Sequence, residues 1–255
     1  MKQIKITDQV NSLEFDFFDN AGGTILRSYE GFEYATVRNV IEDISGKGGA
    51  TYITSKFGRR LISWSGDLVS DDVFTLRRSL MAVLRQQGTM KLIKFTTYDD
   101  LELQCEAEII RVVNPYTHKI HSFLIEAMAP DWRFFSQEEF ETVVDDGFAE
   151  IADNDGNEET DPTFKINGPG TSFIVTNNET GKSFTIERTL EVDDYIEVNV
   201  KERTIILNGT TSIFSNFDGD FIALEPGENE IEFDAVDGAG ATSLSVFFRN
   251  AYNGI

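Results

Sequence analysis

The sequence has little of three residue types on which site chemistry often depends: one cysteine, two histidines and five prolines among 255 residues. A single cysteine cannot form an internal disulfide, and Cys105 falls on the apolar face of an alternating segment, so we expect it in the core. His118 and His121 are three residues apart and would face opposite sides of a strand, which disfavours a shared metal. The sequence therefore predicts neither a metal site nor a cofactor.

Long apolar runs and excess positive charge are also missing. No stretch approaches the roughly 18 apolar residues that cross a bilayer, and the first residues lack the apolar core of a secretory signal. We therefore expect synthesis in a cytoplasm and no membrane contact. The chain has 22 Lys and Arg against 44 Asp and Glu, a net charge of −22. Such a chain repels phosphates, so we expect no specific nucleic-acid binding and only passive contact with DNA.

Motifs of common enzymes are incomplete. The segment Ser63-Trp64-Ser65-Gly66 lacks the glycine that precedes a nucleophilic serine in an elbow turn. Gly46-Lys47-Gly48-Gly49 lacks the ending of a phosphate-binding loop and is interpreted as a flexible loop. In Asp153–Glu159 the glycine comes at the fourth position, which argues against an EF-hand calcium loop. No carboxylate pair for glycoside hydrolysis stands out among 44 acids, so the sequence does not predict an enzyme.

What the sequence does have is a strong β pattern and an uneven charge. Twenty-one phenylalanines and 40% hydrophobic residues indicate a folded chain, long enough for two domains. Residues 1–130 hold 15 basic and 17 acidic residues, whereas residues 131–255 hold 7 and 27. We therefore predict a mainly β protein in three parts: residues 1–130, a β-sandwich or barrel-like domain; residues 131–163, a junction and acidic linker; and residues 164–255, a β-sandwich.

One helix is expected within the first domain, near residues 71–87. Apolar residues recur there at helical spacing, acidic residues precede them as candidate caps, and Gly88 follows. Its polar side carries Arg77 and Arg78. In the last domain, turns such as Asn208-Gly209 punctuate short strands, and Ile231, Phe233 and Ala235 alternate with acids expected to face water.

Several separated segments, taken together, resemble the distal tail protein family of long-tailed, non-contractile bacteriophages. The segments are Tyr29–Tyr34, Gly58–Leu68, Ala129–Phe135, Asn177–Ile186, Asp193–Val198, Arg203–Gly209 and Leu224–Asn229. This resemblance implies a ring-forming N-terminal domain, a homohexamer, and a galectin-like or carbohydrate-module-like C-terminal sandwich. It implies a structural hub at the virion tail tip, with the tail-tube protein and a tail-associated tip protein as partners, and a ring through which DNA passes.

The ring hypothesis assigns roles to particular residues. Because the first domain is nearly neutral, identical copies can approach one another there, while the acidic sandwich belongs on the periphery. The residues expected near subunit contacts are Arg59, Arg60, Trp64, Arg77 and Arg78; the alternative is that they cover their own domain. At the domain junction we expect Trp132, Phe134 and Phe135 to pack and fix the angle between the domains.

The rival interpretation is a glycan-binding module for a cell-surface saccharide. Phenylalanines and acids cluster around one turn of the sandwich and form a candidate sugar shelf; they are Phe214, Phe217, Asp218, Asp220 and Phe221. Alternating phenylalanines of a core give the same pattern. A closed oligomer through the first domain favours the tail hub, whereas a saccharide affinity that depends on these aromatics favours the rival.

Overall fold

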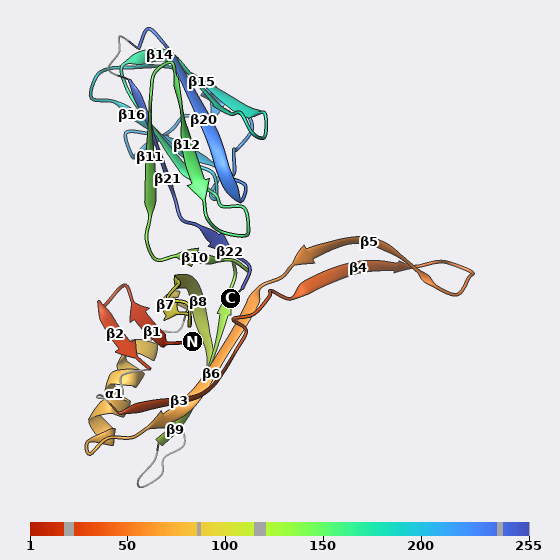
Figure 1. Ribbon diagram of the computed structural model, residues 1–255, viewed down its shortest axis with the longest axis vertical. Coiled ribbons are helices and arrows are strands. Elements are labelled where there is room, and N and C mark those ends of the chain that lie inside the picture. Colours follow the sequence, from red (N-terminus) through yellow and green to blue (C-terminus); the bar gives the residue numbers. More distant parts are fainter. Residues whose placement is uncertain (18–22, 86–87, 115–120, 239–241, 255) are drawn as a thin grey trace. The chain divides into compact units, whose positions relative to one another are not determined.

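A computed structural model describes residues 1–17, 23–85, 88–114, 121–238 and 242–254 (Figure 1). His118 and residues 86–87 of the expected helix lie outside the described residues. The chain divides into two units. Unit 1 holds Met1–Gln137 together with Tyr252–Ile255, and unit 2 holds Glu138–Ala251. The prediction of a mainly β chain with a helix is confirmed.

Unit 1 is built on one large sheet with the strand order β2-β1-β7-β8-β9-β6-β3. Its elements are β1 (Gln3–Asp8), β2 (Leu13–Asp16), β3 (Thr24–Glu30), β4 (Val37–Asp43), β5 (Ala50–Phe57), β6 (Arg60–Leu68), α1 (Val73–Leu84), β7 (Lys91–Thr96), β8 (Glu102–Val113), β9 (His121–Ala129) and β10 (Phe134–Ser136). The short β22 (Ala251–Tyr252), where the chain re-enters unit 1, pairs with β10.

The core of unit 1 follows from the alternation along its strands. In β1 and β7, every second residue is buried, and Ile4 and Ile6 lie opposite Phe95 and Ile93 in the antiparallel register. Opposed side chains share one face of a sheet, so each pair adds to the same apolar layer. Cys105 lies opposite Ile93 on this layer and is buried, as its place in the sequence predicted.

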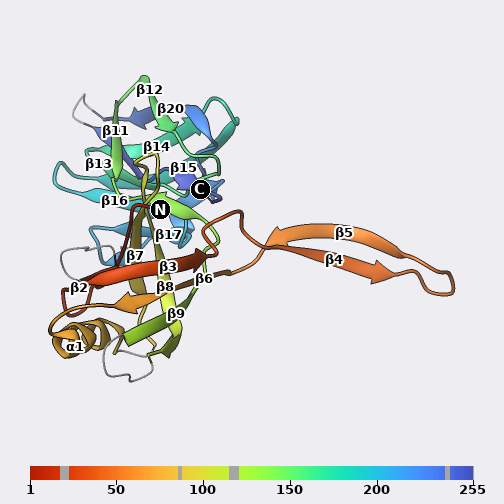
Figure 2. The ribbon, with the colours of Figure 1, turned by 60° about the horizontal axis from the view of Figure 1, so that its bottom comes forward.

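Helix α1 covers part of this layer with the residues that the sequence predicted. Val73, Leu80, Val83 and Leu84 are buried, and the helix contacts β1, β2 and β6 (Figure 2). Asp72 caps the first turn: its carboxylate accepts a hydrogen bond from the backbone nitrogen of Thr75 at 3.2 Å. Such a cap satisfies a backbone donor that has no partner within the helix.

Strands β4 and β5 form a two-stranded sheet of their own, which we call the arm. Both views show the arm apart from the large sheet of unit 1 (Figures 1 and 2). Gly46–Gly49, interpreted from the sequence as a flexible loop, connects the two strands, and Ile44 donates a backbone hydrogen bond to the carbonyl of Gly49 at 3.1 Å. These two strands were not predicted from the sequence.

Unit 2 is a β-sandwich of a six-stranded sheet, β11-β21-β13-β16-β17-β18, and a five-stranded sheet, β12-β20-β14-β15-β19. Its elements are β11 (Phe140–Asp145), β12 (Phe148–Asn154), β13 (Thr163–Asn167), β14 (Gly170–Asn177), β15 (Lys182–Leu190), β16 (Tyr195–Asn199), β17 (Thr204–Leu207), β18 (Thr211–Ser212), the 3-10 turn η1 (Phe214–Asn216), β19 (Phe217–Gly219), β20 (Gly227–Val236) and β21 (Ser243–Phe248).

The two sheets of unit 2 share one hydrophobic core. Phe164 of the first sheet and Phe184 of the second meet edge to face, with ring centroids 5.5 Å apart. On β20, Ile231 and Phe233 are fully buried while Glu230 and Asp234 are exposed, as the alternation predicted. The acids of this strand therefore serve as its solvent-facing side and do not weaken the core.

The expected linker differs from the structure. Residues 131–163 contain three strands, β10, β11 and β12, and the division between the units lies at residues 137 and 138. β11 and β12 form the edges of the two sheets of unit 2, paired with β21 and β20. The many acids of this segment concealed strands whose inward positions include Val144 and Ala152, both buried.

Candidate assembly surface of unit 1

The arm of unit 1 exposes apolar side chains on both strands. In its antiparallel register, Val37 lies opposite Phe57 and Ile41 lies opposite Tyr52, with an irregularity beside Ile41. Opposed residues share a face, so these two pairs follow one side of the arm. Ile41 is 58% exposed and Tyr52 is 59% exposed. The arm thus carries hydrophobic surface of the kind that monomeric proteins usually cover.

The other side of the arm holds a pair of like charges. Arg38 lies directly opposite Lys56, and neither makes an ion pair with a described residue. Like charges opposite each other destabilise a strand pair. A two-stranded hairpin is at best marginally stable in water. The arm therefore exposes apolar side chains on one side and, among the described residues, two unpaired positive charges on the other. A partner that covers both would stabilise the arm.

Arg60, the first residue of β6, lies where the arm joins the large sheet. Its Nε donates to the carbonyl of Trp132 at 2.8 Å, and its Nη1 donates to the carbonyl of Gly31 at 2.9 Å and also to that of Glu33. The guanidinium lies 4.2 Å from the ring centroid of Phe134. Burial lowers the pKa of Arg60 from its ordinary value, but an arginine starts so high that it stays charged near neutral pH.

Aromatic rings surround the same place. Trp132 stacks on Phe57 with centroids 4.1 Å apart, and Tyr34 meets Phe57 edge to face at 5.6 Å. Phe134 is fully buried and packs against Phe32 and against a ring of β7. The aromatic cluster that the sequence marked as a domain junction thus packs on the root of the arm, within unit 1.

Two residues expected near subunit contacts are buried inside unit 1. Trp64 is fully buried and its ring meets Phe17 edge to face at 5.6 Å, while Arg60 is 3% exposed. For these two, the structure favours the alternative that they pack within their own domain. Strand alternation explains the difference for Trp64, because it points to the core side of β6.

The other three arginines of the predicted contact are accessible in the chain. Arg59 and Arg78 are exposed, and Arg77 is half-buried, with its Nε donating to Asn114 at 3.1 Å. The structure does not place a second copy beside them, so their role in subunit contact stays a prediction. The arm is the surface that sequence reasoning missed; its β-branched and aromatic residues beside a glycine-rich turn were the available signal.

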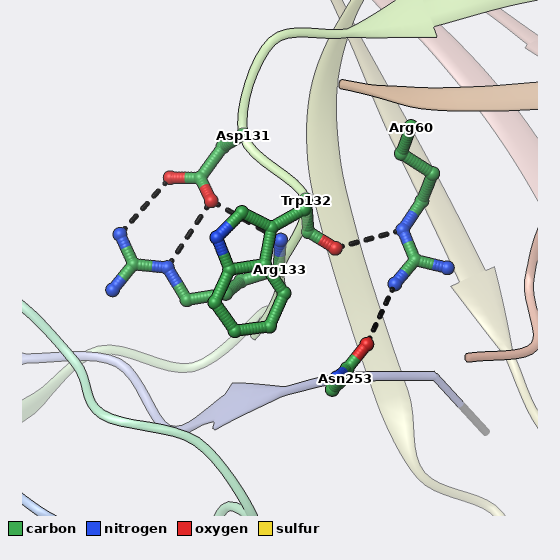
Figure 3. Close-up of polar contacts among 5 residues, drawn as sticks. All are labelled: Arg60, Asp131, Trp132, Arg133 and Asn253. Atoms are coloured by element: carbon green, nitrogen blue, oxygen red, sulfur yellow. Dashed lines mark hydrogen bonds and ion pairs between the residues drawn. The ribbon is translucent and has the colours of Figure 1, made fainter. Parts of the chain in front are cut away.

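Residues 131–135 make a local polar and aromatic arrangement (Figure 3). The carboxylate of Asp131 accepts hydrogen bonds from the backbone nitrogen and the Nε of Arg133, both at 3.1 Å. The Arg133 guanidinium lies 5.3 Å from the ring centroid of half-buried Phe135. These contacts fix residues 131–135 within unit 1. The predicted role of Trp132, Phe134 and Phe135 in the angle between domains stays a prediction.

In unit 2, the candidate sugar shelf forms a stack of rings. Phe217 and Phe221 stack with centroids 4.9 Å apart, and Phe214 lies 6.2 and 6.3 Å from them. Phe214 is 53% exposed, whereas Phe217 and Phe221 are half-buried. Asp218 and Asp220 are exposed beside the rings. The structure therefore brings the five predicted residues together and leaves one ring open to solvent.

The side-chain amide of Asn154 organises the acidic loop Asp153–Glu159, which was compared above with the EF-hand pattern. Asn154 is fully buried; its Nδ2 donates to the carbonyl of Glu158 at 2.8 Å, and its Oδ1 accepts from the backbone nitrogen of Gly156 at 3.2 Å. Among the described residues, no group of three or more His, Cys, Asp or Glu side chains is arranged to hold a metal ion. In the same part of the chain, no helix is long and apolar enough to cross a membrane.

Comparison with protein families finds a match over most of unit 2. Residues 155–252 match the family model of the siphovirus-type tail component, C-terminal domain. The resemblance to phage tail proteins predicted from the sequence is therefore confirmed. No curated protein matches the chain.

Solved structures extend the likeness to both units. The Dit protein of phage SPP1, described as a paradigm of hub adsorption apparatus in phages that infect Gram-positive bacteria, matches with a TM-score of 0.70 and 15% identity over 96% of this chain and 98% of that one. Baseplate structures of phage P2 in its activated conformation, with calcium and with strontium, match with TM-scores of 0.52 and 0.51. Identity there is 12%, and 99% of each chain is covered. At these identities the likeness establishes a shared fold.

Proposed function

We propose that this chain is a structural hub of a phage tail tip. It forms a ring that joins the tail tube to the tail-associated tip or baseplate proteins, and DNA passes through the opening. The observation that carries the proposal is the arm, which exposes Ile41 and Tyr52 and pairs with no other described strand. The family match of residues 155–252 to a tail component supports it independently.

A second copy of the chain is the partner that best suits the arm. Each copy offers an apolar strip on one side of the arm and a cationic pair, Arg38 and Lys56, on the other. Unit 1 is nearly neutral, so six copies can gather around an axis at little electrostatic cost, whereas the acidic unit 2 is better accommodated at larger radius. The number six comes from the family resemblance alone. In this proposal the protein is synthesised in the host cytoplasm and becomes part of the virion tail tip.

The test combines light-scattering mass with negative-stain imaging of the purified full chain at several concentrations. We expect a ring with a central opening. The variant Ile41→Ser with Tyr52→Ser should lose the ring and keep a folded monomer. Its matched control is Val143→Ser with Ile151→Ser, which removes two residues of unit 2 that are each 51% exposed, and it should keep the ring. A ring that survives loss of the apolar strip would contradict the role of the arm.

A second candidate function is binding of a cell-surface glycan by unit 2. The stack of Phe214, Phe217 and Phe221 beside two exposed carboxylates favours it, because an open aromatic face with polar neighbours suits a sugar ring. Binding to a panel of immobilised bacterial glycans should then be lost in Phe214→Ala and kept in Phe148→Ala, which removes another exposed phenylalanine of unit 2. Absence of any bound glycan for the unaltered chain would remove this candidate.

A further inference from the structure

The direction of the arm depends on two short stretches that join it to the rest of unit 1, which we call its feet. The first foot is residues 31–36, before β4, and the second is residues 57–60, from the last residue of β5 to the first of β6. Strands β4 and β5 pair only with each other among the described strands, so the large sheet does not hold them. One backbone hydrogen bond joins the feet, from Gly58 to the carbonyl of Thr36 at 3.1 Å. Without further contacts the arm would hinge at this place.

Arg60 supplies one such contact from the second foot. Its guanidinium donates to two carbonyls of the first foot, those of Gly31 and Glu33, and to Trp132 outside the arm. The planar fork of an arginine fixes several acceptors at once in a defined geometry. Arg60 therefore ties the two feet to each other and to residue 132 of the same unit.

Besides the ring contacts of Tyr34 and Phe57 described above, Asn253 supplies a further contact, and it comes from the far end of the sequence. Its side-chain oxygen accepts from the backbone nitrogen of Ala35 at 2.9 Å and from Nη2 of Arg60 at 3.4 Å (Figure 3). The next residue, Gly254, has φ +101°, and a Cβ there would lie 2.6 to 2.8 Å from backbone atoms of Glu33 and Tyr34. Residues 253–254 thus lie directly on the first foot.

We propose that Arg60 and Asn253 form a clamp that fixes the direction of the arm, and that the arm is ready to engage a neighbouring copy only after residues 252–254 have docked. The second half rests on the proposed ring. Asn253 and Ala35 are separated by 218 positions. The whole of unit 2 is therefore synthesised after Arg60 and before Asn253. Domains fold largely as they emerge during synthesis. The clamp therefore closes last and delays self-association until unit 2 is complete.

The experiment measures the direction of the arm in a background that carries Ile41→Ser and Tyr52→Ser, which should stay monomeric. Spin labels are placed on Lys47→Cys at the arm tip and Ser79→Cys on α1, both exposed positions, and the distance distribution between them is recorded by pulsed electron paramagnetic resonance. Because Cys105 is buried, we expect it to take up no label. The labelled background is compared with the same background carrying Asn253→Ala, Gly254→Ala or the matched control Asn250→Ala. Asn250 is a buried asparagine of unit 2 whose side-chain oxygen accepts a hydrogen bond from the backbone nitrogen of Asp155.

We expect one narrow peak in the background and in Asn250→Ala, and loss of that peak to a broad distribution in both clamp variants. A narrow peak in Asn253→Ala and in Gly254→Ala would overturn the clamp, whether or not the chain forms rings. Ring formation is read separately, from the light-scattering mass of the same clamp variants without the two arm substitutions. The clamp variants could broaden the distance distribution and still form the ring as readily as before. That result would overturn the proposal that docking of residues 252–254 must precede assembly, but it would support the proposal that the clamp fixes the direction of the arm. Thermal unfolding followed by far-ultraviolet circular dichroism, which reports the strands of both units, verifies that each variant is folded.

Discussion

The side-chain oxygen of Asn253 lies 2.9 Å from the backbone nitrogen of Ala35 and accepts its hydrogen bond. Both residues are buried. The contact joins the last described residues of the chain to the root of an arm that begins two residues after Ala35, so the structure of unit 1 needs both ends of the sequence. A buried backbone donor without a partner is costly, which gives this amide a role beyond filling space.

Arg60→Lys should destabilise unit 1 without removing the charge. A lysine cannot reach the carbonyls of Gly31, Glu33 and Trp132 together, so we expect a loss of about 1–3 kcal/mol in the free energy of unfolding. The chain has two tryptophans, Trp64 and Trp132, both in unit 1, so fluorescence during urea unfolding reports this unit selectively. The neighbouring exposed Arg59→Lys is the control and should have no effect; equal stability of the two variants would contradict the role assigned to Arg60.

Charge reversal of the exposed arginines should weaken the ring and leave the monomer folded. In Arg59→Glu with Arg78→Glu we expect a lower light-scattering mass at the same concentration, because each copy would lose two positive charges at the proposed contact and gain two negative ones. High salt should reduce the difference in light-scattering mass between the variant and the unaltered chain, since exposed charges are screened beyond about 10 Å at 0.1 M ionic strength. An unchanged mass at low salt would remove these two arginines from the subunit contact.

Unit 1 should lose stability in acid through carboxyls whose pKa is lowered in the folded state. The pKa of Asp8 is lowered chiefly by a hydrogen bond from the side chain of Asn11, and also by Lys91. A lowered folded pKa stabilises fully above the unfolded pKa, about 3.9, and this contribution disappears as the pH falls through the folded pKa. Stability should therefore fall below about pH 4.

The variant Asn11→Ala tests this origin of the acid sensitivity. It removes the largest cause of the lowered pKa of Asp8, so the decline in urea stability below pH 4 should be shallower than in the unaltered chain. The exposed Asn39→Ala, on the arm, is the matched control and should keep the original slope. Parallel pH profiles for all three proteins would show that Asp8 contributes little to the acid response.

Cys105 should be inert in the native chain. Burial raises the pKa of its thiol to about 12, so the reactive thiolate is almost absent at pH 8. We expect reaction with a thiol reagent only after unfolding, in proportion to the unfolded fraction. The exposed variant Ser79→Cys should react at once under native conditions and serves as the comparison. Fast reaction of native Cys105 would show that the core opens near β8.

Much of the fold was predictable where local pattern and burial agree. The helix was found because its apolar residues recur at helical spacing, and Ile231 and Phe233 of β20 were placed inward by strict alternation. The acidic strands β11 and β12 were missed because eleven acidic residues without a single Lys or Arg in 138–161 suggested a linker. Four of these acids, Glu141, Asp145, Glu150 and Asp153, occupy exposed positions of the two strands, and the inward positions, such as Val144, are few.

The candidate site was less predictable, because its contacts join distant parts of the sequence. The charge of Arg60 suggested a surface residue, but its side chain is buried and donates to three backbone carbonyls. Nothing in the sequence near Asn253 pointed to Ala35, since no local rule connects residues 218 positions apart. The arm escaped notice because its sequence, for instance Val40-Ile41-Glu42, does not alternate strictly, as expected for a strand without a fixed buried face.

The return of the chain to unit 1 makes unit 2 an insertion with two covalent attachments, at residues 137–138 and 251–252. A domain attached by one chain segment can rotate about single bonds of that segment. Two attached segments restrict this rotation even where the surface of the domain makes no contact. The same arrangement limits exchange of modules: another sandwich could replace unit 2 only if its own first and last residues came out side by side, close enough to continue into β10 and β22.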